Sequence, residues 1–363
     1  MSGLIDKINE LKVSFEKGQL IGIDIGLSSV KISLLSNPKK DVYRLEKYVS
    51  FPLSEASIIE DEIQKPDEII NGIKKAIKSS GIQKKIACLG MDGPNTITKR
   101  LQVPDGVREE VEDNILWESE QYIPFGADDS EIGFSILGRI EEEDVVDSVV
   151  GAIKTDVAET YLDYLKEAGI TARVIDLNVF ATINIFELIK EEDLEAISDE
   201  GAIILDLGAQ YTTVIVYKNG GPVLSKEINL GGVLITEEVQ RNLGVSYEEA
   251  EDLKISGDEN GNMIEDVLSI VENHINKVLE ELKKVLNFYI AAGSSEQVGK
   301  CFITGGGSNL PGMKDAIQDL IDIDVEILNP FEVIEIKGKF SDEEIEEIAS
   351  RGLVALGLGM RSI

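Results

Sequence analysis

Two stretches of the chain place an aspartate and a glycine directly after an apolar strand. The first is IGIDIGLSSVKI, from Ile21 to Ile32, and the second is IILDLGAQYTTVIVY, from Ile203. Glycine lacks the Cβ that blocks close approach, so the backbone N–H groups of such a turn can line a phosphate. The carboxylates of Asp24 and Asp206 would repel a phosphate but can hold the water shell of a phosphate-bound Mg²⁺. The repeated turn therefore predicts a triphosphate site in which both aspartates hold the metal through water.

The two turns occupy matching places in a duplicated set of elements. Around the first turn we expect strands at 19–25 and 30–35, a third strand DVYRLEKYVSFPL, a helix over Pro66–Ser80 and the strand KKIACLGM. The same order recurs as AIILDLG, TTVIVYKNG with Asn219-Gly220 as its end turn, GPVLSKEINL, a helix from about Leu234 and KCFITGGG. The pattern predicts an α/β protein of two β-β-β-α-β halves, with a nucleotide in the cleft between them.

A third glycine-rich turn, ITGGGSNLPGM from Ile303 to Met313, follows a buried strand and precedes a helix. Glycines there let the backbone lie flat against an adenine or a ribose, and a helix N-terminus favours phosphate. The spacing is neither a Rossmann motif nor a Walker P-loop. Lys31, on the strand that leaves the first turn, can reach back to phosphate oxygens. A single Asp-x-Gly turn is more often a plain tight turn, and the alternative for Lys31 is a solvated strand lysine. Two such turns at matching places, with the glycine-rich turn, favour a nucleotide site.

Composition excludes several classes of function. The formal charge is −33, from 35 basic and 68 acidic residues, and such a surface repels nucleic acid and anionic lipid but attracts a basic partner. Two cysteines and a single histidine, His274, argue against a disulfide framework or a zinc site. The sequence has no apolar run long enough to span a membrane and no secretion signal, so we expect a cytoplasmic protein.

The order of these motifs resembles the actin, Hsp70 and sugar-kinase superfamily. The resemblance matches the first phosphate loop to Asp24–Lys31, the second to Asp206–Thr213 and the adenosine motif to Gly305–Asn309. EEAEDLK contains Glu251 and Lys254 at the E-x-x-K spacing that contacts ribose and adenine in this superfamily.

The resemblance implies ATP and Mg²⁺ as ligands. It implies catalytic roles for Asp24, Asp206 and Asn184, the last at the place where actins carry a water-positioning glutamine. The nucleotide-contacting residues that it implies are Gly26, Leu27, Ser28, Ser29, Lys31, Gly208, Ala209, Gln210, Thr212, Gly231, Gly232, Glu251, Lys254, Gly305, Gly306, Gly307 and Ser308.

Within the superfamily the chain is most similar to the PilM family of the type IV pilus inner-membrane platform. GIDIGLSSVKI, WESEQYIPF, NLGG, EEAEDLK and ALGLGMRS occur in the order of that family. PilM resembles the division protein FtsA, which ends in a linker and a membrane-binding amphipathic helix. This sequence ends at Ile363 without such a helix, which favours PilM over FtsA.

The resemblance to FtsA implies a subdomain called 1C in place of the usual actin insertion. The expected subdomains are 1A over residues 1–91, 155–199 and 346–363, 1C over 92–154, 2A over 200–243 and 301–345, and 2B over 244–300.

The resemblance to PilM also implies a partner. Proteins of that family bind the short N-terminal cytoplasmic tail of PilN, a single-pass inner-membrane protein, in a groove between 1A and 1C. The candidates for shaping this groove are Trp117, Tyr122, Ile123, Pro124 and Phe125; the alternative is that they form the small core of 1C. The family also implies contact with the pilus motor ATPase. The expected role is a cytoplasmic scaffold that meets the membrane only through its partners.

Some residues depart from the superfamily pattern. Leu27 stands where relatives carry a serine or threonine that can bind a terminal phosphate, and Ala209 and Gln210 replace a more polar loop. Asn184 is a poor general base. We therefore expect ATP binding with slow turnover at most, and a nucleotide that acts mainly as a clamp. The alternatives are an FtsA-like division protein or a polymerising bacterial actin, and a sugar kinase, for which the sequence offers no convincing set of sugar-binding residues.

Overall fold

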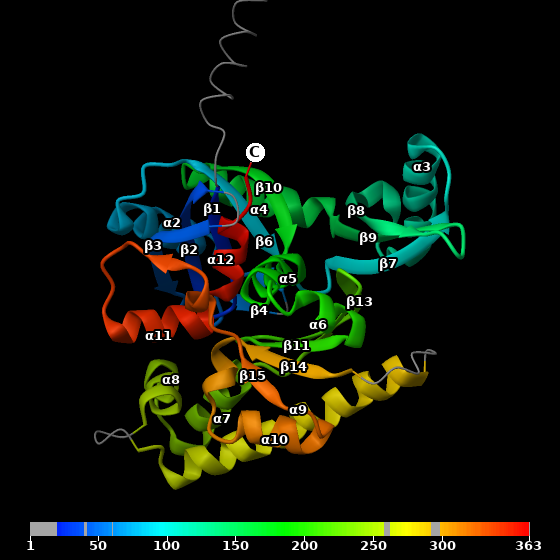
Figure 1. Cartoon of the computed structure of the whole chain (residues 1–363). Coiled ribbons are helices and arrows are strands. Elements are labelled where there is room, and N and C mark those ends of the chain that lie inside the picture. Colours follow the sequence, from blue (N-terminus) through cyan, green and yellow to red (C-terminus); the bar gives the residue numbers. More distant parts are fainter. Residues whose placement is uncertain (1–19, 40–41, 60, 258–261, 292–297, 363) are drawn as a thin grey trace, which may run out of the picture.

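Two mixed β-sheets with matching strand order organise the two halves of the molecule (Figure 1). The computed structural model describes residues 20–39, 42–59, 61–257, 262–291 and 298–362. The first sheet has the order β10-β6-β1-β2-β3-β16. Its strands are β1 (Ile21–Ile25), β2 (Ser29–Lys39), β3 (Val42–Pro52), β6 (Ile86–Met91), β10 (Thr171–Leu177) and β16 (Glu335–Ile336).

The second sheet repeats the central part of the first. Its order is β13-β12-β11-β14-β15, and its strands are β11 (Ala202–Leu207), β12 (Thr212–Lys218), β13 (Gly221–Ile228), β14 (Lys300–Thr304) and β15 (Val325–Ile327). In both sheets three antiparallel strands are followed by two parallel ones. Asp24 pairs with Lys31 across β1 and β2, and Asp206 pairs with Thr213 across β11 and β12. The predicted duplication is confirmed down to this register.

Helices cover both sheets. The first half carries α2 (Pro66–Ser80), α4 (Thr155–Glu167), α5 (Asn178–Ile189) and α12 (Leu353–Gly359), and the second carries α7 (Val233–Leu243), α8 (Tyr247–Ser256), α9 (Glu265–Ala291) and α10 (Met313–Ile321). Between them lie α6 (Leu194–Glu200) and α11 (Asp342–Arg351). Local signals set several boundaries. Pro66 begins α2 and Gly81 ends it at φ 68°, which are favoured positions for these residues. None of the described helices combines the length and apolar composition needed to cross a membrane.

A third, smaller sheet follows β6 and stands apart from the two halves (Figure 1). Its order is β7-β9-β8, with β7 (Thr96–Pro104), β8 (Ser130–Ile140) and β9 (Val145–Lys154), and α3 (Arg108–Ser119) packs on it. It has a core of its own, made of Leu101, Val103, Val111, Ile115, Val146 and Val150. We call β7, β8, β9 and α3 the small domain. The sequence analysis did not predict these three strands.

The small domain lies within the predicted range of 1C, but the subdomain boundaries stay predictions. Residues 1–19 of 1A and 258–261 and 292–297 of 2B lie outside the described residues. The short strand β16 pairs with β3 of the first sheet. The chain therefore returns to the first half before residue 345, where we had placed the end of 2A.

Close packing through glycine joins α12 to the strand that carries Asp24. A Cβ at Gly22 would lie 2.2 Å from the carbonyl oxygen of Ala355 and 2.5 Å from the backbone nitrogen of Gly359. Ser33 on β2 donates its hydroxyl to the same Ala355 oxygen at 2.6 Å. Helix α12 thus lies directly on β1 and β2 and holds the first aspartate loop in place.

We expect Gly22→Ala to destabilise the protein because the added methyl meets backbone atoms that cannot move aside. Overpacking of this kind costs roughly 1–3 kcal/mol. Urea denaturation measures the loss. The matched control is Gly133→Ala on β8, where an added Cβ meets no atom within 4 Å. Equal midpoints for the two variants would contradict the assignment of close helix–strand packing.

Candidate functional site

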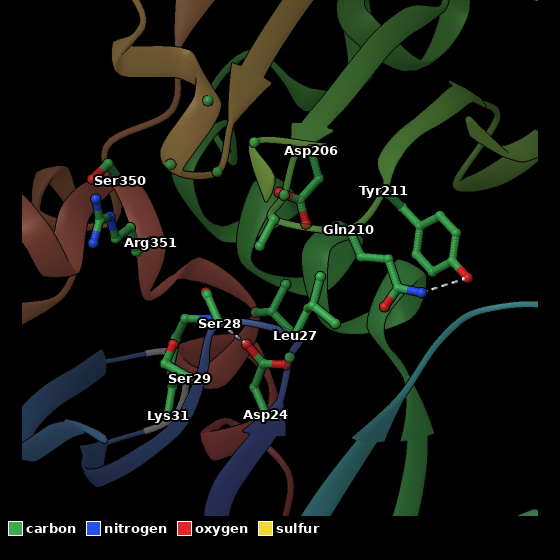
Figure 2. A pocket seen from close by; sticks show the side chains of 18 of the residues that line it. Asp24, Leu27, Ser28, Ser29, Lys31, Asp206, Gln210, Tyr211, Ser350 and Arg351 are labelled. Carbon is green, nitrogen blue, oxygen red and sulfur yellow. Dashed lines mark hydrogen bonds and ion pairs between the residues drawn. The ribbon is translucent and has the colours of Figure 1, made fainter. Parts of the chain in front are cut away.

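A cleft of about 480 Å³ lies between the two halves, within the range of small-molecule sites. It forms where the parallel strands of both sheets end, as expected for ligand sites in α/β folds. Strand β1 contributes Asp24, β6 is followed by Asp92, and β10 is followed by Asn178. From the second sheet come Asp206 on β11 and Thr304 on β14. Figure 2 shows Asp24 and Asp206 entering the cleft from the two halves.

Most of the predicted nucleotide residues meet in this cleft. Those that line it are Asp24, Gly26, Leu27, Ser28, Ser29, Lys31, Asp206, Gly208, Ala209, Gln210, Gly232, Glu251, Lys254, Gly305, Gly306 and Gly307. Three others lie behind the lining and support the loops. Thr212 donates to the carbonyl of Leu230 at 2.7 Å and Ser308 to that of Gly305 at 2.7 Å. A Cβ at Gly231 would lie 2.2 Å from the backbone of Ala209.

The placement of Asn184 at the cleft is wrong. Helix α5 begins at Asn178, which lines the cleft, whereas Asn184 lies further along the helix and lines a separate pocket with Tyr43 and Glu187. Of the two asparagines on α5, Asn178 is the one that lines the cleft.

The two aspartate turns have the same backbone geometry. The N–H of Gly26 donates to the carbonyl of Ser29 at 3.1 Å, and the N–H of Gly208 donates to that of Tyr211 at 2.9 Å. The glycine loop after β14 closes against the second turn. Gly305 has φ of 83°, and a Cβ there would lie 2.5 Å from the carboxylate of Asp206. Only glycine fits at that position, because any side chain would displace the aspartate.

Negative charge dominates the floor of the cleft. Asp24 is buried and accepts a hydrogen bond from the Lys31 ammonium at 2.8 Å. Desolvation and the neighbouring charge of Asp24 raise the pKa of Asp206 to about 6, against the opposing effect of Lys31. Among the described residues no group of three or more acidic, histidine or cysteine side chains is arranged to bind a metal ion directly. Two carboxylates without further ligands suit a cation that keeps its water shell.

Asp92 belongs to the same acidic floor. Asp92 is accessible from the cleft, but desolvation by the surrounding protein and the charges of Glu227, Asp24 and Asp206 raise its pKa, although Asn178 donates a hydrogen bond to it at 2.8 Å. The sequence analysis missed both Asp92 and Asn178. Asp92 follows β6, the parallel neighbour of β1, and Asn178 follows β10, the parallel neighbour of β6, so both lie at the sheet edge where β1 ends.

Contacts across the cleft tie the halves together on one side. Asp61, between the short strands β4 (Ile58–Ile59) and β5 (Glu62–Ile63), accepts hydrogen bonds from the Tyr211 hydroxyl at 2.6 Å and from Gln210 at 2.9 Å. The N–H of Gly93 donates to Glu227 at 2.9 Å. Asp61 and Gly93 belong to the first half, and their partners belong to the second.

The predicted E-x-x-K pair forms a compact cluster in the second half. The Lys254 ammonium lies 2.5 Å from Glu251, 2.8 Å from the Thr236 hydroxyl and 3.2 Å from the carbonyl oxygen of Gly232. Burial lowers the pKa of Lys254, and the charge of Glu251 opposes this. The cluster therefore presents a fixed polar edge to the cleft beside the glycine loop.

Two buried polar atoms at the cleft have no hydrogen-bond partner among the described residues, the Thr304 hydroxyl and the Asn178 amide oxygen. Unpaired buried polar groups are rare and call for a partner. Together with the exposed backbone of three glycine turns, they make the cleft fit for a polar, phosphate-bearing ligand.

The predicted partner residues differ in how far their side chains are exposed to solvent. Trp117 is 66 % exposed, and Tyr122 is 39 % exposed with the Lys99 ammonium 4.5 Å from its ring centre. Pro124 is exposed and Phe125 half-buried, whereas Ile123 is buried. Trp117 and Tyr122 are therefore not the core of the small domain, and both are accessible to a partner.

We expect Asp92→Asn to raise the melting temperature more above about pH 8 than at about pH 5. The raised pKa makes Asp92 hold its proton to a higher pH in the folded protein than in the unfolded chain, where an aspartate ionises near 3.8. The unfolded state therefore binds fewer protons between the two pKa values, and stability falls as the pH rises through them. Asparagine removes this dependence and can still accept the bond from Asn178. The control is Asp67→Asn at an exposed position; equal gains at both pH values would contradict the raised pKa.

Comparisons with known proteins agree with this architecture. The family model described as type IV pilus assembly protein PilM matches residues 22–363. Cell division protein FtsA of Bacillus subtilis (strain 168) is 23 % identical over 85 % of this chain and 78 % of its own length. FtsA of Staphylococcus epidermidis (strain ATCC 12228 / FDA PCI 1200) is 26 % identical over 39 % of this chain, and the match spans about a third of that protein, 34 %.

Solved structures show the same fold. A chain of the PilM-PilN type IV pilus biogenesis complex superposes with a TM-score of 0.81 at 24 % identity, covering 95 % of this chain and 98 % of its own. Ethanolamine utilization protein EutJ from Carboxydothermus hydrogenoformans gives a TM-score of 0.53 at 12 % identity over 94 % of this chain and 89 % of its own. The predicted actin-like fold of two duplicated halves is confirmed. Because the family model spans nearly the whole chain, the protein belongs to the PilM family of type IV pilus assembly proteins.

Proposed function

We propose that this protein is a nucleotide-gated scaffold of the type IV pilus inner-membrane platform. It binds Mg-ATP in the cleft and the cytoplasmic tail of a membrane partner on the small domain. The observation that carries the proposal is the meeting of two equivalent aspartate turns and a glycine loop in one cleft between the halves. Membership of the PilM family supports the role in pilus assembly.

The residues around the cleft suggest how ATP is held. The backbone of Gly26–Lys31 and Gly208–Gln210 would receive the phosphates, and Asp24 and Asp206 would orient the water shell of Mg²⁺. The Glu251–Lys254 pair and the glycines at 305–307 would hold the ribose and the base. The cation supplies the positive charge that lets a triphosphate approach two carboxylates. This is consistent with a cleft in which Lys31 and Lys254 already pair with acidic side chains.

Slow turnover fits the side chains at the phosphate end. Leu27 offers no hydroxyl, and its side chain projects between Asp24 and Asp206 in the view of Figure 2. Asn178 carries an amide, which orients water but does not take up a proton. The bound nucleotide would therefore act mainly by fixing the angle between the halves.

The proposed partner follows from the similarity of this chain to a solved structure. A structure with the same fold belongs to a PilM-PilN complex, and Trp117 and Tyr122 are accessible here. We propose that these two, with Pro124 and Phe125, receive the N-terminal tail of a PilN-type protein, and that buried Ile123 supports them. A chain of net charge −33 attracts a basic tail. The same family role would place the protein in the cytoplasm at the inner membrane, held there by its partner, and in contact with the motor ATPase.

The small domain has a direct connection to the second half. Arg100 on β7 forms a bidentate pair with Asp147 on β9, in which Nε donates to Oδ1 at 2.9 Å and Nη2 donates to Oδ2. The same guanidinium donates to the carbonyl oxygens of Lys218 and Asn219 in the β12–β13 turn, at 2.5 and 3.3 Å. A change in the angle between the halves would therefore reach the small domain through Arg100 and alter the partner site.

We expect Asp24→Asn and Asp24→Ala to abolish Mg²⁺-dependent ATP binding, because both remove the charge that orients the metal's water shell. Asparagine keeps the shape of the side chain and so separates loss of charge from loss of folding. Isothermal titration calorimetry with ATP, with and without Mg²⁺, measures the effect. Asp67→Asn, at an exposed position on α2, is the control. Unchanged affinity for Mg-ATP in both Asp24 variants would contradict the assignment of the metal site.

We expect Arg100→Lys to weaken the effect of Mg-ATP on partner binding. Lysine keeps the positive charge beside Asp147, but it lacks the planar guanidinium that donates to both carbonyl oxygens of the turn. The probe is a synthetic peptide of the partner's cytoplasmic tail, with affinity measured by fluorescence anisotropy. In the wild type, Mg-ATP should strengthen binding by roughly 5–150-fold, and in Arg100→Lys the two affinities should converge.

Two further variants serve as controls for this experiment. Trp117→Ala should lose the peptide under all conditions, and Arg108→Lys, at a position 86 % exposed on α3, should behave as the wild type. A full nucleotide effect in Arg100→Lys would show that the β12–β13 turn does not transmit it. Absence of peptide binding to the wild type would overturn the proposed partner.

A further inference from the structure

One positively charged side chain of the cleft has no role in the function proposed above. Three such residues line the described cleft, Lys31, Lys254 and Arg351. The two lysines lie 2.8 and 2.5 Å from carboxylates. Arg351 has only Glu347, one turn earlier on its own helix, at 3.9 Å. No hydrogen bond links its guanidinium to another residue in the part of the chain that the structure describes. Its five N–H donors and its planar face therefore remain available to a ligand.

Arg351 reaches from one half of the molecule to the other. It ends α11, just before α12 of the first half. Its stem lies against the glycine loop of the second half, because a Cβ at Gly306 would be 3.4 Å from Cγ and from Nε of Arg351. Figure 2 shows Arg351 and Ser350 on the side of the cleft away from Gln210 and Tyr211. The hydrogen bonds that join the halves at Asp61 lie on the Gln210 and Tyr211 side, so Arg351 stands on the other.

The position of Arg351 marks the base end of the cleft. Burial is the main reason that the pKa of Lys254 is lowered, and the nearby positive charge of Arg351 adds to it. Arg351 therefore shares with Lys254 and the glycine loop the end where the ribose and base would lie. Asp24 and Asp206 mark the other end, where the phosphates would lie.

We propose that Arg351 lies over the base of the bound nucleotide and stacks its guanidinium on a purine ring. This inference rests on the nucleotide site proposed above. A guanidinium is planar and weakly hydrated, and it stacks on aromatic faces better than an ammonium does. Because Gly306 has no side chain, the aliphatic part of Arg351 can lie against the glycine loop. A purine, with its larger face, gains more from this contact than a pyrimidine.

The contact has a structural consequence. Arg351 ends α11 immediately before α12 of the first half, whereas Glu251, Lys254 and the glycine loop come from the second. A base held between them joins the two halves opposite the Asp61–Tyr211 hydrogen bond. Binding of the nucleoside part alone would then favour closure of the cleft, independently of the phosphates and the metal.

The test compares ligands that share the base but differ in phosphate number. The affinities of ATP, ADP and adenosine are measured for the wild type, Arg351→Ala and Arg351→Lys, by competition against a fluorescent ATP analogue that each variant binds measurably. We expect Arg351→Ala to lose about tenfold, or about 1.4 kcal/mol, for all three ligands alike. Arg351→Lys should show a similar loss, because it keeps the charge but not the plane. CTP should be affected less than ATP.

Two controls accompany these variants. Glu347→Gln removes the weak ion-pair partner of Arg351 and should leave affinity unchanged or slightly raised. Arg108→Ala removes an arginine at an exposed position far along the small domain and should have no effect. If Arg351→Ala does not fold, Arg351→Met keeps the stem over Gly306 and takes its place.

The outcomes separate this inference from the function on which it rests. A loss that grows from adenosine to ATP and is restored by lysine would mean a phosphate contact and would overturn stacking. Unchanged affinities in Arg351→Ala would overturn any contact with the nucleotide. A wild type that binds none of the ligands would overturn the nucleotide site itself, and this inference with it.

Discussion

Two carboxylates that face one cleft set the conditions for the rest of the structure. Asp24 and Asp206 lie on equivalent strands of the two sheets, and the charge of one raises the pKa of the other. Lys31 offsets part of this repulsion from a distance of 2.8 Å to Asp24. The tight glycine contacts at Gly22 and Gly305 keep both carboxylates in position. A hydrated cation is the natural remaining partner for two carboxylates so arranged.

The same arrangement connects the cleft to more distant parts of the molecule. Because each half supplies one aspartate turn, a ligand that touches both turns fixes how the halves meet. Hydrogen bonds at Asp61 and Glu227 already hold one side of the cleft together. Arg100 of the small domain donates a hydrogen bond to the carbonyl oxygen of Lys218 in the second half. We propose that a change in the angle between the halves reaches the small domain, where Trp117 is exposed, through Arg100.

Local patterns predicted what depends on local chemistry. The repeated strand–Asp–x–Gly turns, the glycine loop and the Asn219-Gly220 hairpin turn could be identified because glycine and short polar residues are needed at those backbone positions. Asn219 and Gly220 do have positive φ, 49° and 75°. The three strands of the small domain were missed, although Ile132, Phe134 and Ile136 alternate along β8 and β9 is largely buried.

Residues brought in by long-range packing could not be placed in the same way. Placing Asp92 and Asn178 required knowing that β6 lies beside β1 and β10 beside β6. The contact of Arg351 with Gly306 depends on how the last helices return to the first half. Asn184 was misplaced by six residues: Asn178, at the start of α5, lines the cleft, and a residue six positions later lies on a different face of the helix.

The central claim is that one nucleotide bridges the two halves. Hydrogen–deuterium exchange of the whole chain, with and without Mg-ATP, tests it most directly because it reports on each loop separately. The account predicts simultaneous protection of the amides at 26–31 in the first half and at 208–211 and 305–309 in the second. Protection confined to the loops of one half, or absent from all three, would contradict it.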